Sequence, residues 1–298
     1  MTNPSALTAA SGHDAANDGP AAPGGPPAPA MPAMRAAPAA PPCQRWRLYV
    51  AQPAADVPER GAGAGGRSWA AILASSALPL AGEGSRVRVA PAAALPLGIA
   101  GEREVVDLYL AERRTIAEVR AAVVDALPPG WELVDLHDAW VGAPAAPAAV
   151  VAADYRVVVA GAARWVLEGA ALALLEASSL PRERRREKRT TTYDLRPLLL
   201  DLSVRGGGAE GVTLAMRLRH APDAVGRPEE VVAALGDRTV PVAGEPATAL
   251  RSRPIPPLGE LPAPPPGAPP APAGPLVVRS AVRERLIMAG DPGAPERS

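Results

Sequence analysis

Residues 188–204 read KRTTTYDLRPLLLDLSV, and their apolar positions alternate in opposite phases on the two sides of Pro197. Alternation with a period of two is typical of a strand that buries one face. Proline cannot donate to a sheet ladder, and a bulge that inserts one residue reverses the facing of everything after it. The stretch is therefore predicted to be two strands joined by a bulge at Pro197, with Asp194 and Arg196 pointing outward on the same face.

Similar patterns occur on both sides of this stretch. Alternating runs predict strands at 45–50, 85–90, 103–112, 131–138, 154–160, 211–220 and 239–244, and helical spacing predicts helices at 67–78, 115–127, 163–178 and 226–237. Thr115 and Glu118 have the spacing of a capping box at the start of the second helix. The order β-α-β-β-α-β therefore occurs twice. It predicts an α+β fold of two tandem ferredoxin-like halves with antiparallel sheets.

Composition divides the chain into five parts. The first residues are rich in alanine, proline and glycine, and they carry too little apolar surface to offset the entropy of ordering. A second proline-rich stretch is typical of an extended spacer. The short segment after it is interpreted either as a docking peptide or as an element that folds back. The predicted parts are a disordered tail (1–42), two halves (43–145 and 146–253), a linker (254–275) and the C-terminal segment (276–298).

Charge and cysteine content limit the classes of function. The chain has 298 residues, with 31 Lys and Arg against 31 Asp and Glu, so no overall charge attracts it to nucleic acid or membrane. Cys43 is the single cysteine, which excludes a disulfide framework or a cysteine-built cluster within this chain. No signal peptide or membrane-spanning run is visible, and the sequence predicts a cytoplasmic protein without a cofactor or metal of its own.

Arginines recur at strand positions that alternate with apolar residues. In a ferredoxin-like unit the helices cover one face of the sheet, so these side chains are expected on the open face. A row of guanidinium groups there would suit a phosphate backbone; an ordinary solvated surface is the alternative. The candidate RNA- or partner-binding residues are Arg47, Arg88, Asp107, Arg189, Asp194, Arg196, Arg217 and Arg219.

Three further features have competing interpretations. The run PRERRREKR (181–189) carries six Arg and Lys against two Glu, and it predicts a solvated loop or a nucleic-acid contact. Asp107 is either a general base or nucleophile, or the charge partner of a neighbouring arginine. The glycine-rich GAGAGG (61–66) lacks the spacing of a phosphate-binding loop after a strand, so a flexible loop is favoured.

Several motifs in a fixed order carry a resemblance to a known family. They are LPLGIAGEREVVDLYL (95–110), LPPGWELVD (127–135), AADYRVVV (152–159), TYDLRPLLLDLSV (192–204) and GRPEEVVAALG (226–236). Over about 45–250 the chain resembles a bacterial family of radical-SAM-linked proteins of unknown function, whose domain is encoded beside, or fused to, a radical SAM protein. Genes of that family often lie near those for an E/G-type ribonuclease and ribosomal proteins. Two histidine-containing motifs of the family are replaced here by AQPAADVPERGAGAGG and PLAGEGSRVRVA.

Three hypotheses follow. In the first, the chain is a non-catalytic accessory protein of a radical SAM enzyme and binds RNA, or possibly the ribosome or another ribonucleoprotein, on its arginine-lined sheet face. In the second, it is an RNA-modifying enzyme with a pseudouridine-synthase-like cleft, and Asp107 or Asp194 is the nucleophile; fold analogy supports this hypothesis. In the third, it is an adaptor that binds only proteins. The resemblance implies a radical SAM protein as partner, because this chain cannot supply a three-cysteine cluster.

Overall fold

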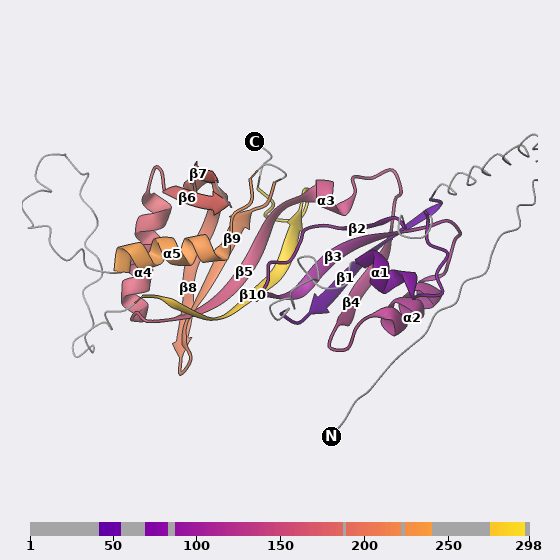
Figure 1. Ribbon diagram of the computed structural model, residues 1–298, viewed down its shortest axis with the longest axis horizontal. Coiled ribbons are helices and arrows are strands. Elements are labelled where there is room, and N and C mark those ends of the chain that lie inside the picture. The colour runs from indigo at the N-terminus through magenta and orange to yellow at the C-terminus, as the bar shows by residue number, and fades with distance from the viewer. Residues whose placement is uncertain are drawn as a thin grey trace, which may run out of the picture. The chain divides into compact units, whose positions relative to one another are not determined.

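The computed structural model describes residues 42–54, 69–82, 87–186, 189–221, 224–239 and 275–295, without the side chains of 185–189. The elements in chain order are β1 (Gln44–Gln52), α1 (Trp69–Ala74), β2 (Val89–Pro91), β3 (Ala100–Leu110), α2 (Ile116–Ala126), β4 (Glu132–Ala139), α3 (Ala146–Ala149), β5 (Val150–Ala160), α4 (Arg164–Glu176), β6 (Pro181–Arg186), β7 (Arg189–Asp194), η2 (Arg196–Leu198), β8 (Leu199–Gly208), β9 (Gly211–Arg219), α5 (Pro228–Thr239) and β10 (Val277–Met288). Figure 1 shows their arrangement. The predicted tail, the GAGAGG stretch and most of the proline-rich linker lie outside the described residues.

The main sheet has eight strands in the order β4-β1-β3-β10-β5-β9-β8, and β2 also pairs with β3. Neighbouring strands are antiparallel except for β10 and β3, which run parallel where Val282 and Arg283 meet Ala100 and Gly101. The fold is therefore mixed α+β with a largely antiparallel sheet, as the sequence predicts. One continuous sheet runs through both predicted halves.

The N-terminal core lies between one face of the sheet and α1 and α2. The even-numbered residues of β1, such as Leu48, pack against Leu73 of α1 and Val119 of α2. Thr115 accepts from the Glu118 amide and the Glu118 carboxylate accepts from the Thr115 amide, so the predicted capping box is present. Because side chains alternate along a strand, the odd-numbered residues of β1 point to the opposite face.

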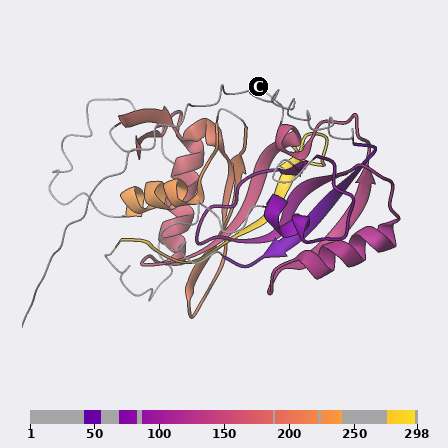
Figure 2. The ribbon, with the colours of Figure 1, turned by 45° about the vertical axis from the view of Figure 1, so that its right-hand side comes forward.

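The C-terminal core lies between β5, β8 and β9 and the helices α4 and α5. Every second residue of β9, from Val212 to Leu218, is buried against Leu174 of α4 and Leu235 of α5. In both ribbon views α4 and α5 lie together beside β8, whereas α1 and α2 lie beside β1 and β4 (Figures 1 and 2). Arg217, between buried positions of β9, lies on the face opposite these helices.

The phase change at Pro197 has a different origin from the predicted bulge. Residues before it form β7, which pairs with β6 in a separate two-stranded sheet, and residues after it form β8 of the main sheet. Between them the chain makes a single 3-10 turn, Arg196–Leu198. The two alternation phases thus belong to strands of different sheets, and the basic run 181–189 is largely part of a hairpin instead of a solvated loop.

The C-terminal segment supplies the strand at the middle of the sheet. β10 pairs antiparallel with β5, from Val277 opposite Ala160 to Met288 opposite Val150. Of the two interpretations of this segment, the structure therefore has the one in which it folds back. The sequence predicts a strand at 239–244. Its first residue, Thr239, instead ends α5, and residues 240–244 lie outside the described residues.

Candidate functional site

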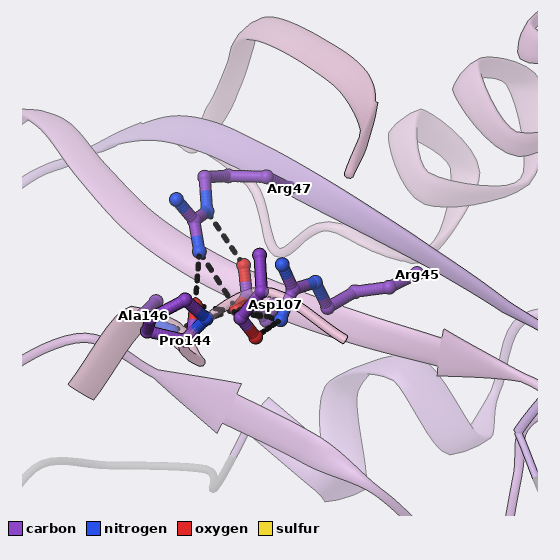
Figure 3. Close-up of polar contacts among 6 residues, drawn as sticks. Arg45, Arg47, Asp107, Pro144 and Ala146 are labelled. Atoms are coloured by element: carbon purple, nitrogen blue, oxygen red, sulfur yellow. Dashed lines mark hydrogen bonds and ion pairs between the residues drawn. The ribbon is translucent and has the colours of Figure 1, made fainter. Parts of the chain in front are cut away.

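Asp107 is the centre of a closed cluster on the sheet face opposite α1 and α2. Arg47 of the neighbouring strand donates to both carboxylate oxygens, from Nε at 2.8 Å and from Nη2 at 3.0 Å, and the Ala146 amide donates to Oδ2 at 2.7 Å (Figure 3). Arg45 Nη1 lies 3.8 Å from the same oxygen and donates to the carbonyl of Ala143 at 2.8 Å. Asp107 has no exposed surface, so it has the role of a charge partner for two arginines.

The sheet face opposite the helices is predicted to be open, but part of it is covered. Arg45 points away from the helices, but it is 1% exposed because residues 143–146 lie over it. The hydrogen bond that Arg47 donates to Asp107 raises the pKa of Arg47 against the opposing effect of burial. The Asp107 carboxylate is thus buried and hydrogen-bonded on both of its oxygens.

Asp194 and Arg196 both bond backbone groups at a chain junction. Asp194 Oδ1 accepts from the amides of Leu180 at 2.7 Å and Arg196 at 2.9 Å, and these bonds lower the pKa of the carboxyl group. The Arg196 guanidinium donates to the carbonyl of Leu175 near the end of α4 and to the carbonyl of Leu199. Cations favourably meet the negative end of a helix. Both residues therefore join α4, the hairpin and β8.

On the face opposite α4 and α5, arginines lie beside carboxylates. Arg217 donates to both oxygens of Asp154, at 2.7 and 3.0 Å, and Arg285 donates to the same group at 2.9 Å. Burial alone would raise the pKa of Asp154, but the bonds from the two arginines outweigh it and the pKa is lowered. Arg156 likewise bonds Glu284 and Glu102. This face is a mosaic of opposite charges.

The remaining predicted residues are dispersed. Arg219 donates to the carbonyl of Pro197 at 3.3 Å. Arg88 is exposed and lies over the ring of Tyr109, 4.2 Å from its centroid. Arg189 begins β7, but its side chain is not among those described. The structure brings Arg47 together with Asp107, places Arg217 and Arg219 on one face of β9, and leaves Arg88 apart from both groups.

Sequence reasoning missed a second buried ion pair, between Glu104 of β3 and Arg283 of β10. Arg283 is 1% exposed, and its Nε donates to Glu104 at 2.8 Å. Its Nη2 and Nη1 donate to the carbonyls of Ala93 and Ala94, at 3.2 and 3.1 Å. A signal was present: Glu104 precedes Val106 and Leu108 at the alternating positions that face the core. An acid in such a register needs a buried cation.

Arg283 also lies on the floor of a cleft of about 920 Å³. Residues 94–99 form one wall, residues 225–229 at the start of α5 form another, and Tyr155 and Val157 of β5 complete the floor. The lining is mostly aliphatic and includes Leu95, Leu97, Ile99, Val157, Val232 and Val278. Its polar groups include Arg184, Arg227, Glu229 and His220.

Electrostatics inside the cleft favour a neutral histidine. Burial, together with the positive charge of Arg283, lowers the pKa of His220 to about 4. Burial raises the pKa of Tyr155, so its hydroxyl stays protonated. Arg227 lies 3.6 Å from Glu229, whereas Arg184 has a buried Nε without a hydrogen-bond partner among the described residues. The cleft therefore combines an apolar lining with one cation that has unused donor capacity.

The described residues contain neither a metal-ligating cluster nor a membrane-crossing helix. Their histidine, cysteine, aspartate and glutamate side chains form no group of three or more that is arranged to hold a metal ion. None of the helices within the described ranges has the length and apolar character needed to cross a bilayer.

Comparison with known proteins finds a family model that is similar to part of the chain. Residues 83–228 match a family model described as "Uncharacterized protein conserved in bacteria (DUF2344)". No curated protein matches the chain. The matched region contains Asp107, Asp194, one wall of the cleft and the other wall as far as Pro228, but it excludes β1 and β10. Over this region the chain is similar to that bacterial family.

Proposed function

We propose that the chain is a non-catalytic accessory module that acts with a radical SAM protein in the cytoplasm and binds an RNA or ribonucleoprotein substrate. The observation that carries the RNA part is the hairpin of β6 and β7. The run 181–189, which lies largely in this hairpin, holds six Arg and Lys against two Glu, and β6 and β7 pair with each other in a sheet separate from the main one. Phosphate backbones bind such local concentrations of cations.

The hairpin is a better RNA contact than the sheet face. Arginines of the face already bond carboxylates, as Arg217 does with Asp154, and binding phosphate there would require those bonds to break. Arg182 of the hairpin contacts acids of α5, whereas Arg185, Arg186 and Arg189 belong to the pairs at the other end of the strands from Pro181 and Asp194. The proposed RNA contact therefore centres on these cations, Arg189 included.

Two observations support an accessory instead of an enzymatic role. Asp107 and Asp194, the candidate nucleophiles, are occupied by arginine and backbone donors. The single cysteine leaves any iron–sulfur chemistry to the partner, which the resemblance to radical-SAM-linked proteins suggests. A pull-down from crosslinked cells, with and without ribonuclease, tests the partner. Recovery of a radical SAM protein in both arms is expected, and its absence from both would contradict the partnership.

We also infer that the fold is a tandem pair of ferredoxin-like units. Two observations support this. The first four main-sheet strands in chain order lie as β4-β1-β3-β2, and the remaining four lie as β10-β5-β9-β8. In each set the fourth strand lies beside the first, the first beside the third, and the third beside the second. One helix follows the first strand and another follows the third strand of each set.

The RNA proposal is tested with a fluorescein-labelled 20-nucleotide single-stranded RNA, by anisotropy over a range of salt concentrations. Replacing Arg185, Arg186 and Arg189 by glutamine should remove about three phosphate contacts. The plot of log K against log salt should then fall less steeply, with a slope smaller in magnitude by about 2. The matched control replaces Arg217 and Arg219 by glutamine and should leave the slope unchanged. Equal binding by the hairpin variant and the unmodified chain would contradict the proposal, and so would a loss of binding confined to the control.

A further inference from the structure

The cleft has the features of a small-molecule site separate from the proposed RNA contact. Its volume of about 920 Å³ lies within the range of roughly 300–1,000 Å³ that is usual for ligand pockets. Such pockets are mostly apolar with a few convergent polar groups. Its floor comes from strands of the central sheet, and Val157 and Arg283 there are each 1% exposed.

Its shape is held by the buried ion pair. Arg283 reaches from β10 to Glu104 and to the carbonyls of Ala93 and Ala94, which lead into the wall formed by residues 94–99. These contacts use the Arg283 guanidinium for structure, and its charge is balanced by Glu104. Arg283 therefore positions the wall, and a different cation has to meet a ligand.

Arg184 is that cation. It extends from β6 to the lining of the cleft, with its guanidinium carbon 4.9 Å from the centroid of the Tyr193 ring. Its Nε is buried and has no hydrogen-bond partner within the described residues. Buried polar groups without a partner are costly, and an anionic ligand would satisfy this one. The other cation of the mouth, Arg227, is paired with Glu229.

We propose that this cleft binds a small amphiphilic anion, with a single carboxylate or phosphate head on Arg184 and an aliphatic body on the lining. Among the described residues that line the cleft, Arg184 is the one cation without a bonded carboxylate, which fits one head group. Aliphatic side chains, among them Leu95, Val157 and Val232, fit a flexible chain better than an aromatic ring. The neutral His220 adds a hydrogen-bonding group without adding charge. This proposal does not depend on RNA binding.

Four probes test it by isothermal titration with the full chain, below their micelle concentrations: decanoate, decyl phosphate, decanol and decyltrimethylammonium. Decanoate or decyl phosphate should bind with one-to-one stoichiometry and at least about 10-fold more tightly than decanol, and the cationic probe should not bind. The comparison of the two anions identifies the preferred head group. Binding of decanol as tight as that of both anions would overturn the proposal, as would the absence of binding by any probe.

Variants locate the site. Arg184→Leu should weaken binding of the preferred anion about 10-fold and leave decanol unchanged, because it removes only the head-group contact. Val278→Trp, at an exposed position of the lining, should weaken every probe that binds. Arg205→Leu, an exposed arginine of β8 that does not line the cleft, is the control. Unchanged anion binding by both Arg184→Leu and Val278→Trp, with melting curves like that of the unmodified chain, would place the ligand elsewhere.

Discussion

β3 carries two buried acids, three residues apart, on opposite faces of the sheet. Glu104 bonds Arg283, which also donates to the carbonyls of Ala93 and Ala94. Asp107 bonds Arg47 and lies beside Arg45, whose guanidinium donates to the carbonyls of Ala143 and Pro144. In both places a buried arginine joins a strand acid to two successive carbonyls of a loop.

The difference between the two clusters lies in what surrounds them. The Asp107 cluster has two arginines and is covered by residues 143–146, so the loop closes over the charges. The Glu104 cluster has one arginine and lies on the floor of the cleft, so its loop becomes a wall of a site. The same interaction thus seals one face of the sheet and keeps a cleft open on the other. A buried ion pair by itself is not evidence of a functional site.

The largest expected effect is that of Asp107→Ala. It leaves two guanidinium groups buried without their carboxylate, and breaking a buried pair in this way typically costs about 3–5 kcal/mol. The free energy of unfolding from urea titration should fall toward the upper end of that range. Asp135→Ala, which removes a half-exposed partner of Arg103, is the control and should cost less than about 1 kcal/mol. Equal losses in the two variants would refute the structural role of Asp107.

Glu104→Ala should lower the free energy of unfolding by less, about 3 kcal/mol. Only one arginine loses its partner in this variant, and water can reach that arginine from the cleft. Urea titration measures the loss. The same variant should weaken anion binding, since the wall formed by residues 94–99 loses its anchor. A loss of stability larger than that of Asp107→Ala would reverse the comparison.

His220, which lines the same cleft as Arg283, makes the free energy of unfolding depend on pH. Its pKa in the folded chain is about 4, below the value of 6.5 for an ordinary histidine, so folding favours the neutral form. The stabilisation of the folded chain by neutral His220 is complete above pH 6.5 and is lost as the pH falls toward 4. Between pH 7 and 4.5 the unmodified chain should lose about 2 kcal/mol more stability than His220→Gln. Parallel pH profiles for the two chains would contradict this assignment.

The half-exposed pairs on the sheet face should contribute least. Asp154→Asn weakens the bonds to Arg217 and Arg285, whose side chains are 28% and 53% exposed, and should cost about 1 kcal/mol in urea titration. Since folding lowers the pKa of Asp154, this contribution is complete above the pKa of an unfolded aspartate, near 4, and is lost as the pH falls through the lower pKa of the folded chain. A cost that persists unchanged at pH 2.5 would show that packing, not charge, is responsible.

Local signals predicted the parts of the fold that depend on neighbouring residues. The capping box at Thr115 and Glu118 and the alternation through β1, β5 and β9 are properties of a few adjacent positions. The phase change at Pro197 was visible, but its cause was not, because the choice between a bulge and a turn into another sheet depends on which strand pairs with which. β10 was harder to assign, since its partners β3 and β5 lie more than 100 residues earlier.

The site residues show a similar limit. Alternation correctly places Arg47, Asp107 and Arg217 on the face opposite the helices, because that depends only on strand periodicity. Their burial and pairing depend on long-range contacts: Asp107 meets Ala146 across 39 residues, and Glu104 meets Arg283 across 179. The cleft combines residues 94–99 with segments from β5, β6, α5 and β10, and no local pattern identifies it.

Hydrogen–deuterium exchange of Asp107→Ala and Glu104→Ala tests most directly whether the two clusters hold separate loops. Asp107→Ala should speed exchange at Ala146, Ala148 and Ala149 and leave Ala92 and Ile99 protected. Glu104→Ala should have the reverse effect. If either variant releases both loops equally, or neither variant releases its own loop, the two acids of β3 do not act as separate anchors and the account of the sealed face and the open cleft is wrong.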